Sequence, residues 1–229
     1  MKIEVWSDYA CPFCYIGEKR LQRALDEIGD KNISVEFKSF ELDPAASREV
    51  ESSTAERFAL KYGLTLEAAT ERIEQISRMG RDEGIDFKYL TTRYTNTFDA
   101  LRLTKFAQSK GHDEIITEFF DAYFTKNLEL SDHAVLKKIA AKCELDGKDV
   151  EEILNGNRYA EDVRADEMQA ARLGIHGVPY FVVGGKYGLS GAQPVEVFKQ
   201  AITEALAEDA EEIFGGMTCG ADGCKFDGR

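Results

Sequence analysis

The sequence is poor in proline, in basic charge and in long hydrophobic runs. Only 4 of its 229 residues are proline, and no apolar run approaches the ~18 residues that span a bilayer. Residues 1–16 also lack the basic start and the long apolar stretch of a secretory signal. We therefore expect a cytoplasmic protein without a membrane partner.

Basic side chains are outnumbered by acidic ones. The 29 Lys and Arg residues face 42 Asp and Glu residues, which gives a formal net charge of −13 at pH 7. This sign is wrong for neutralising phosphates, so we expect no nucleic-acid partner. The remaining composition, 43% hydrophobic and 31% charged, is that of an ordinary globular chain, and 229 residues are enough for one domain with a sizeable insertion.

The first 40 residues predict a strand, a helix and a second strand. Residues 2–7 and 33–40 alternate polar and apolar side chains, as half-buried strands do. Between them, apolar residues recur at helical spacing over residues 11–28, and Gly29 follows, where a left-handed residue ends a helix favourably. Because a helix is the natural crossover between neighbouring strands, the two strands should be parallel.

The middle of the chain has a different character. Residues 52–173 contain no proline and only six glycines. Apolar residues at helical spacing predict five to seven helices with short breaks in this segment. Ser53 and Glu56, near its start, have the spacing of a capping box.

Glycine returns after the helical segment. Six glycines occur in the 18 residues from 174 to 191. Residues 180–183 and 186–190 predict two antiparallel strands around a two-residue Gly184-Gly185 turn, which suits positive φ angles. A closing helix should begin at Pro194, because proline is tolerated at the first helical position.

Cys11-Pro12-Phe13-Cys14 is the strongest chemical signal in the chain. Two cysteines three positions apart at the start of a helix put Cys11 beside unpaired backbone N–H groups and the positive end of the helix dipole, which stabilise a thiolate. Pro12 suits the first turn because its missing N–H is not needed there. We expect Cys11 to be the exposed attacking thiol and Cys14, shielded one turn inside the helix, to be the resolving thiol.

The same cysteine spacing is also half of a tetrahedral zinc site. The second half is missing nearby, and a CxxC that follows a strand and opens a helix favours redox chemistry. We therefore expect no metal at this pair.

A second cysteine pair, Cys219 and Cys224, lies in the glycine-rich segment 215–229. This segment lacks periodicity and is predicted to be a mobile tail. Three interpretations stay open: a second redox pair, a two-thiolate metal half-site, and incidental thiols. The redox pair is favoured because a metal needs more ligands than the segment offers. Cys143 lies on the apolar face of a predicted helix and is interpreted as a small buried hydrophobe.

The histidines and the single tryptophan receive no catalytic role. His176 could approach Cys11, but an ordinary loop histidine is the favoured interpretation. His112 and His133 lie near predicted helix starts and are interpreted as solvated or capping residues. Trp6, in the first predicted strand, is expected to be buried under the sheet.

Pro179 stands at the start of the predicted hairpin. Proline is allowed at the first residue of a strand because it need not donate to the ladder. The alternative is a cis Val178–Pro179 bond, which would hold the Val178 backbone extended for a substrate beside the CxxC, although only ~5% of such bonds are cis. The local sequence leaves both interpretations open.

Four segments, taken in chain order, resemble the DsbA-like thioredoxin-fold family. They are residues 7–17 (SDYACPFCYIG), 96–100 (NTFDA), 177–179 (GVP) and 190–193 (SGAQ). The resemblance covers nearly the whole chain and is greatest to the cytosolic branch called FrnE, a thiol:disulfide oxidoreductase. Some FrnE-like proteins also carry a C-terminal CxxxxC similar to that of Cys219 and Cys224.

The resemblance implies an α/β thioredoxin fold, with a mixed parallel and antiparallel sheet, that is interrupted by a large all-helical insertion. The corresponding boundaries are 1–45 with 174–214 for the thioredoxin-like domain, 46–173 for the insertion and 215–229 for the tail. The resemblance also implies that Cys11 is the nucleophile, that Cys14 resolves, and that the Val178–Pro179 bond is cis and lies across from them.

Two groups with this fold depend on glutathione: kappa-class glutathione transferases and 2-hydroxychromene-2-carboxylate isomerases. They carry serine in place of Cys11 and tend to show a Ser-Asp pair that grips glutathione where this sequence has Ser190-Gly191. The favoured function is therefore disulfide exchange with protein or small-molecule thiols and disulfides, without a cofactor, and glutathione stays open as a partner. A glutathione-dependent isomerase or transferase, and a metal-binding or redox-sensing module, are the alternatives.

Overall fold

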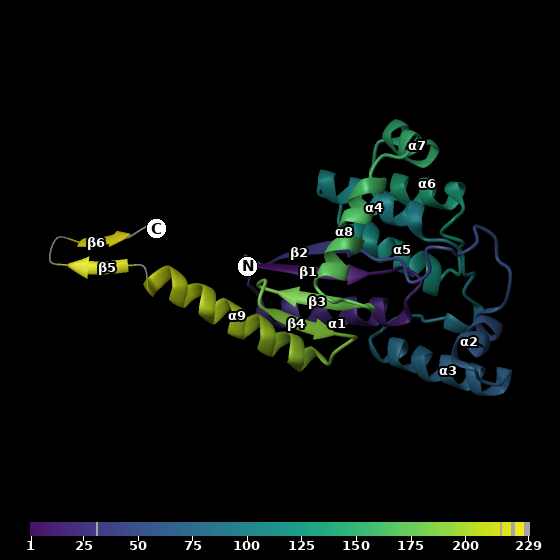
Figure 1. Ribbon diagram of the computed structural model, residues 1–229, viewed down its shortest axis with the longest axis horizontal. Helices are drawn as coiled ribbons and strands as arrows, with labels where there is room; N and C mark the ends of the chain where they lie inside the picture. Colours follow the sequence, from purple (N-terminus) through teal and green to yellow (C-terminus); the bar gives the residue numbers. More distant parts are fainter. Residues whose placement is uncertain (31, 216, 221–222, 227–229) are drawn as a thin grey trace.

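The computed structural model describes residues 1–30, 32–215, 217–220 and 223–226, with side chains described as far as residue 209. A four-stranded sheet with the strand order β2-β1-β3-β4 forms its centre (Figure 1). The strands are β1 (Lys2–Ser7), β2 (Ser34–Ser39), β3 (Tyr180–Val183) and β4 (Tyr187–Ser190). β1 is parallel to β2, whereas β3 is antiparallel to both β1 and β4. The sheet is therefore mixed, as predicted, and joins the two ends of the sequence.

Helices cover both faces of the sheet. Ile3 and Val5 point to the face that is packed by α1 (Pro12–Ile28) and α9 (Val195–Gly215). Trp6 points to the opposite face, because side chains alternate along a strand, and is fully buried under α8 (Ala160–Arg172), where its Nε1 donates a hydrogen bond to the Asp166 carbonyl at 3.0 Å. The predicted burial of Trp6 is confirmed.

The segment between β2 and β3 is helical, as predicted. Its helices are α2 (Thr54–Tyr62), α3 (Leu66–Asp82), α4 (Phe98–Lys110), α5 (Glu114–Phe124), α6 (His133–Lys142), α7 (Gly147–Asn155) and α8, with the 3-10 turn η1 (Tyr89–Thr91) between α3 and α4. The predicted capping box is present at the start of α2, where the Ser53 hydroxyl accepts from the Glu56 N–H and the Glu56 carboxylate accepts from the Ser53 N–H.

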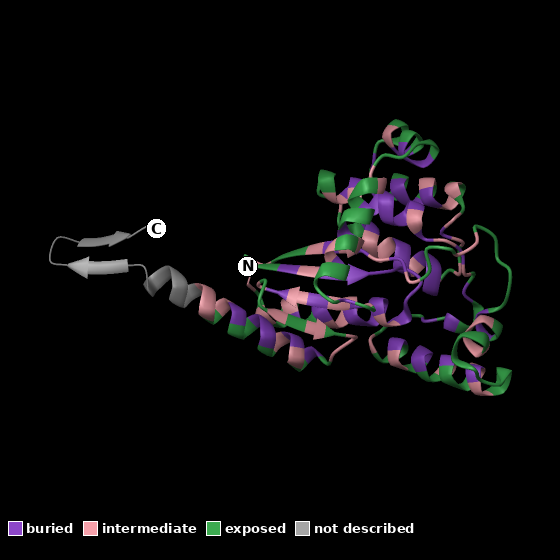
Figure 2. Cartoon of the chain, in the orientation of Figure 1, coloured by how far each residue is buried: buried purple, intermediate pink, exposed green. Residues whose placement is uncertain are grey.

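Aromatic side chains join the sheet to these helices. The Tyr9 ring stacks on Phe37 with 5.4 Å between centroids and meets the Phe119 and Phe120 rings edge-on at 5.1 and 5.0 Å. Figure 2 shows buried residues continuing from the sheet into α4 and α5. This packing fixes the turn between β1 and α1, which carries the CxxC.

The predicted hairpin turn is wrong by one residue. Val183 pairs with Tyr187, so Gly184, Gly185 and Lys186 form a three-residue connection. Both glycines have positive φ angles, 60° and 69°, and the Lys186 N–H donates to the Val183 carbonyl at 3.1 Å, which closes the turn before the third residue rejoins the strand. α9 likewise begins one residue after Pro194.

The chain ends in two short strands, β5 (Met217–Gly220) and β6 (Gly223–Phe226), which pair antiparallel with Cys219 opposite Cys224. The side chains of both cysteines lie outside the described residues, and the predicted mobility of residues 215–229 stays a prediction. Among the helices that the structure describes, none has the length and apolar character that a bilayer crossing requires.

Candidate active site

The Cys11 thiol lies at the N-terminal end of α1. Cys11 is the N-cap residue, with an extended backbone (φ −91°, ψ 115°), and Pro12 is the first helical residue. The helix begins one residue later than predicted, because proline is favoured at this first position. The Cys11 side chain makes no capping hydrogen bond to the helix. Its sulfur lies at the helix N-terminus, the end at which backbone N–H groups lack intrahelical partners and the helix dipole is positive.

Both thiols of the pair are buried, which corrects the expectation of an exposed Cys11. The exposed fraction is 4% for Cys11 and 2% for Cys14, and neither forms a disulfide. Cys11 nevertheless lines a groove of about 880 Å³, together with Phe13, Tyr89 and Val178. Sequence reasoning missed this shielding because the walls of the groove come from distant segments.

The loop before β3 lies directly against Cys11. The Val178–Pro179 peptide bond is cis, as the resemblance implied. The Cys11 thiol donates a hydrogen bond to the Val178 carbonyl oxygen, with 3.4 Å between Sγ and O. The Pro179 carbonyl accepts from the Gly191 N–H at 2.8 Å, which ties the loop to the end of β4.

Cys14 has a different environment from Cys11. Burial raises the pKa of Cys14 well above its usual range, and the neighbouring Cys11 thiol raises the pKa further. The Ser7 hydroxyl and the Asp8 backbone act in the opposite direction but are weaker. The Cys14 thiol is therefore held protonated and out of solvent.

The Asp8 carboxylate ties three segments together behind the CxxC, a role that sequence reasoning missed. It is buried and accepts hydrogen bonds from the Ala10 N–H at 3.2 Å, the Leu42 N–H at 2.8 Å and the Thr97 hydroxyl at 2.8 Å. Burial raises the pKa of Asp8 despite these three donors. The sequence offered little indication of this role. Asp8 and Thr97 both lie in segments that resemble the family, but they are 89 positions apart.

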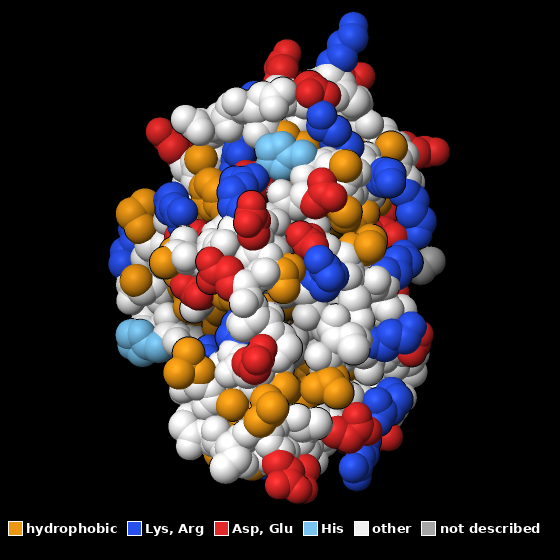
Figure 3. Space-filling model, turned by 90° about the vertical axis from the view of Figure 1, so that its right-hand side faces the viewer, with side chains coloured by type: hydrophobic (Ala, Val, Ile, Leu, Met, Phe, Trp, Pro, Cys, Tyr) orange, Lys and Arg blue, Asp and Glu red, His pale blue; other side chains and the backbone are white. Residues whose placement is uncertain are grey.

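Helices α2 and α3 form the far wall of the Cys11 groove. The wall is largely apolar, through Phe58, Tyr62, Leu64, Ala68, Ile76 and Met79. It also carries three cationic side chains, Arg57, Lys61 and Arg72. Figure 3 views this end of the molecule and shows hydrophobic side chains gathered among charged ones near the bottom, where α2 and α3 lie in Figure 1. The apolar residues of α2 and α3 recur at the spacing of any amphipathic helix, so the sequence pattern did not identify them as the wall of a groove.

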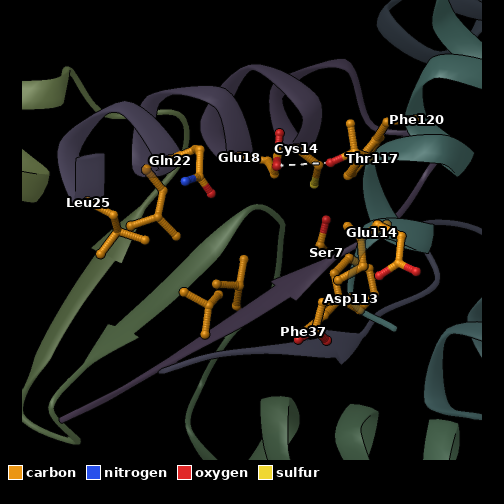
Figure 4. Close-up of a pocket in the computed structure, with 14 residues that line it drawn as sticks. Ser7, Cys14, Glu18, Gln22, Leu25, Phe37, Asp113, Glu114, Thr117 and Phe120 are labelled. Carbon is orange, nitrogen blue, oxygen red and sulfur yellow. Dashed lines mark hydrogen bonds between the residues drawn. The ribbon is translucent and has the colours of Figure 1, made fainter. Parts of the chain in front are cut away.

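A second cavity, of about 350 Å³, lies on the inner side of α1 (Figure 4). Cys14 and Glu18 line it from successive turns of α1, and Ser7 and Thr117 line it from the opposite side. The Thr117 hydroxyl donates to Glu18 Oε1 at 3.3 Å, whereas buried Glu18 Oε2 has only an ion contact of 3.5 Å with Lys19 Nζ. Burial raises the pKa of Glu18.

Cys143 and the histidines do not line the Cys11 groove. Cys143 is buried, as predicted, and burial raises its pKa to about 11. His133 Nε2 lies 2.8 Å from Asp99 Oδ2, a contact that its sequence position did not indicate, and His176 is exposed. Over the described ranges, no group of three or more His, Cys, Asp or Glu side chains is arranged to hold a metal ion.

A mixed sheet of this order, a dithiol at the start of α1 and a cis-proline loop against it define a thioredoxin-fold protein with a dithiol site. The chain belongs to the DSBA-like thioredoxin domain family, which matches residues 2–203. The fold is accordingly a DsbA-like thioredoxin fold with a large helical content.

The chain is also similar to solved structures and to a curated protein. The chain is 35% identical to SCO1869 from Streptomyces coelicolor, described as a probable DsbA oxidoreductase, with a TM-score of 0.86 and 100% of both chains covered. It is 27% identical over 208 residues to the uncharacterized protein YwbO of Bacillus subtilis (strain 168), over 88% of this chain and 96% of that protein. The cytosolic disulfide reductase DsbM from Pseudomonas aeruginosa, in a structure with GSH, shares the fold with a TM-score of 0.60 at 14% identity, over 93% and 99% of the two chains.

Proposed function

We propose that this chain is a thiol:disulfide oxidoreductase in which Cys11 attacks and Cys14 resolves. The observation that carries the proposal is the pair of thiols at the start of α1, with Cys11 Sγ at the helix N-terminus and 3.4 Å from the Val178 oxygen. Membership of the DSBA-like family supports the same chemistry. The CxxC favours exchange over the glutathione-dependent isomerase or transferase, and over a metal-binding or redox-sensing module.

The proposed reaction proceeds in two exchanges. The Cys11 thiolate attacks one sulfur of a substrate disulfide, which forms a mixed disulfide and releases the other substrate sulfur as a thiolate. Cys14 then loses its proton and attacks the Cys11 sulfur, so that a Cys11–Cys14 disulfide forms and the second substrate thiolate leaves. The raised pKa of Cys14 keeps it protonated until the first exchange is complete. The reverse reaction starts from the Cys11–Cys14 disulfide and transfers it to a dithiol substrate.

The residues between and beside the cysteines contact the substrate in this proposal. Pro12 and Phe13 form the active-site loop, and the Phe13 side chain lines the groove that leads to Cys11. Val178 and Pro179 form the substrate-binding loop, since the Val178 carbonyl faces the reacting sulfur. The substrate backbone next to its disulfide would lie along this loop. One of its N–H groups would donate to the Val178 oxygen in place of the Cys11 thiol.

The proposed setting is the cytoplasm. The fold neighbour DsbM is described as a cytosolic disulfide reductase, and its structure contains GSH, which supports glutathione as a small-thiol partner of this chain. The four family-like segments and the C-terminal CxxxxC are the grounds on which we propose the cytosolic FrnE-like branch for this chain. Cys219 and Cys224 are the proposed second redox pair.

The test is a pair of cysteine variants incubated with an oxidised model peptide. Cys14→Ser should accumulate a mixed disulfide with the peptide at Cys11, because the resolving thiol is absent, and mass spectrometry without reductant should detect one peptide per chain. Cys11→Ser should form no adduct and lose exchange to the uncatalysed background. Cys143→Ser is the control and should exchange at the normal rate. An adduct on Cys14 in Cys11→Ser would reverse the assigned roles.

A further inference from the structure

The far wall of the Cys11 groove holds three cations without ionic partners. Within the described part of the chain, Arg57, Lys61 and Arg72 form no salt bridge. The Arg57 guanidinium stacks on Tyr94, with 3.6 Å from Cζ to the ring centroid, and its buried Nε has no hydrogen-bond partner among the described residues. Arg72 Nη1 donates to the Gln75 side chain, at 3.1 Å. These positive charges are available to an incoming molecule.

Unpaired cations are informative in a chain with a formal charge of −13. Elsewhere on the surface many cations pair with carboxylates, as Arg23 does with Glu83 and Arg158 does with Asp149. Among the residues that line the groove the ratio is inverted, with Glu71 as the carboxylate against the three cations. A groove of this charge in an acidic protein attracts an anionic segment and repels a basic one.

The apolar surface extends beyond the groove. Leu60, Tyr62, Leu64 and Leu66 on the α2–α3 hairpin are exposed by 87%, 57%, 40% and 54%. They adjoin the groove through Tyr62 and Leu64, which line it, and belong to the end of the molecule where Figure 3 shows hydrophobic side chains. Four exposed apolar side chains on one hairpin beside a site favour a polypeptide partner, since a small thiol would cover only the groove itself.

We infer that the Cys11 groove and the α2–α3 hairpin select protein disulfides whose flanking residues are apolar and acidic. The inference rests on the proposed function, because it names the substrate of that same site. The carboxylates of the segment would meet Lys61, Arg72 and the free edge of Arg57, and its apolar side chains would lie on the α2–α3 wall. Each turnover reduces one peptide disulfide to two thiols while the Cys11–Cys14 dithiol is oxidised to a disulfide, so two electrons and two protons pass to the peptide.

The experiment measures the second-order rate of single-turnover exchange between the reduced protein and three peptide disulfides. The peptides share the same apolar residues and differ only in whether Glu, Gln or Lys flanks each cysteine. We expect the Glu peptide to react about tenfold faster than the Lys peptide at low salt, with the Gln peptide between them, and the difference to shrink at high salt because exposed charges are screened.

Two variants locate the preference on the groove. Lys61→Gln and Arg72→Gln should each slow the Glu peptide about threefold and leave the Gln peptide unchanged, since both side chains are exposed and each replacement removes one positive charge from the groove. Arg78→Gln is the matched control. Arg78 lies on α3, as Arg72 does, and is exposed. It pairs with Glu74 at 3.6 Å and does not line the groove. The control variant should leave all three rates unchanged.

The outcomes separate this inference from the proposed function. Equal rates for the Glu, Gln and Lys peptides would overturn the inference and leave the oxidoreductase intact, whereas no exchange with any of them would overturn the proposed function. Glutathione disulfide is the fourth substrate. If it reacts faster than every peptide and its rate falls in Lys61→Gln and Arg72→Gln, the cations select a small anionic disulfide and the polypeptide assignment is wrong.

Discussion

Cys11 Sγ lies 3.4 Å from the Val178 carbonyl oxygen, although the two residues are 167 positions apart in the chain. The pairing of β1 with β3 explains this proximity. The strands are antiparallel, with Trp6 opposite Tyr180, so the end of β1 lies beside the start of β3. Cys11 follows the first of these ends and Val178 precedes the second. The site is therefore assembled where the first and last parts of the sheet meet.

Cys11 should be alkylated first. With iodoacetamide at pH 7, we expect Cys11 to be labelled at least about tenfold faster than Cys14 or Cys143, because burial raises the pKa of both of these thiols and the thiolate is the reactive form. Peptide mapping by mass spectrometry at several times gives the order. Faster labelling of Cys14 would show that the shielded and attacking thiols had been exchanged.

Glu18→Gln should stabilise the protein increasingly as the pH rises. Burial raises the pKa of Glu18 in the folded state above its unfolded value. A raised pKa in the folded state means that protonated Glu18 contributes favourably to the free energy of unfolding. This contribution is complete below the unfolded pKa of ~4.3 and is lost as the pH rises through the folded pKa. Gln stays neutral throughout, so the variant avoids this loss.

The measurement is the free energy of unfolding of wild type and Glu18→Gln in urea between pH 4 and pH 8. The advantage of the variant should grow across this range. Glu27→Gln is the control with the opposite sign, because its ion pair with Lys199 lowers the pKa of Glu27. A constant difference between wild type and Glu18→Gln at all pH values would contradict the assigned cause.

Gly80→Ala should destabilise the protein by about 1–3 kcal/mol, because it overfills a packed site. A Cβ at Gly80 would lie 2.6 Å from two Phe87 ring atoms and 2.9 Å from Phe87 Cβ. Phe87 cannot move aside, since its ring is stacked on Phe124 with 4.6 Å between centroids and is 2% exposed. The clash outweighs the better helix propensity of alanine, which is worth about 1 kcal/mol.

Gly147→Ala is the matched control for that substitution. A Cβ at Gly147, the first residue of α7, would meet nothing within 4 Å. This variant should therefore be neutral or more stable by up to about 1 kcal/mol. Thermal or urea unfolding of both variants decides the point. An equally stable Gly80→Ala would show that α3 can shift away from Phe87.

The tail cysteines should support turnover but not the first attack. Cys219 and Cys224 face each other across the β5–β6 pairing, where opposed Cα atoms are ~4.5–5.5 Å apart, within the range of a disulfide. We expect them to form a disulfide under mild oxidation. A double variant, Cys219→Ser with Cys224→Ser, should slow multiple-turnover exchange about threefold or more and leave the single-turnover rate unchanged. Loss of the single-turnover step would mean that Cys219 and Cys224, and not Cys11 and Cys14, carry out the first attack.

Much of the fold followed from local patterns. Alternation over residues 2–7, helical spacing up to Gly29 and the glycine-rich hairpin each predicted an element that the structure contains, because these patterns reflect backbone preferences and the period of one buried face. The hairpin turn was missed by one residue, since Gly184-Gly185 suits both a two-residue and a three-residue connection. Local patterns do not fix such boundaries, because the same residues are compatible with several types of turn.

The sequence by itself determined that two thiols stand at one helix start, with Pro12 in its first turn. Tertiary structure alone decided that Cys11 is buried, that Val178 lies against it and that Asp8 is held by donors from three segments. It also decided that Arg57 and its neighbours on α2 and α3 line the same groove as Cys11. The physical reason is that burial, access and charge near a thiol depend on which distant segments the packed core brings together, and no local period encodes that contact.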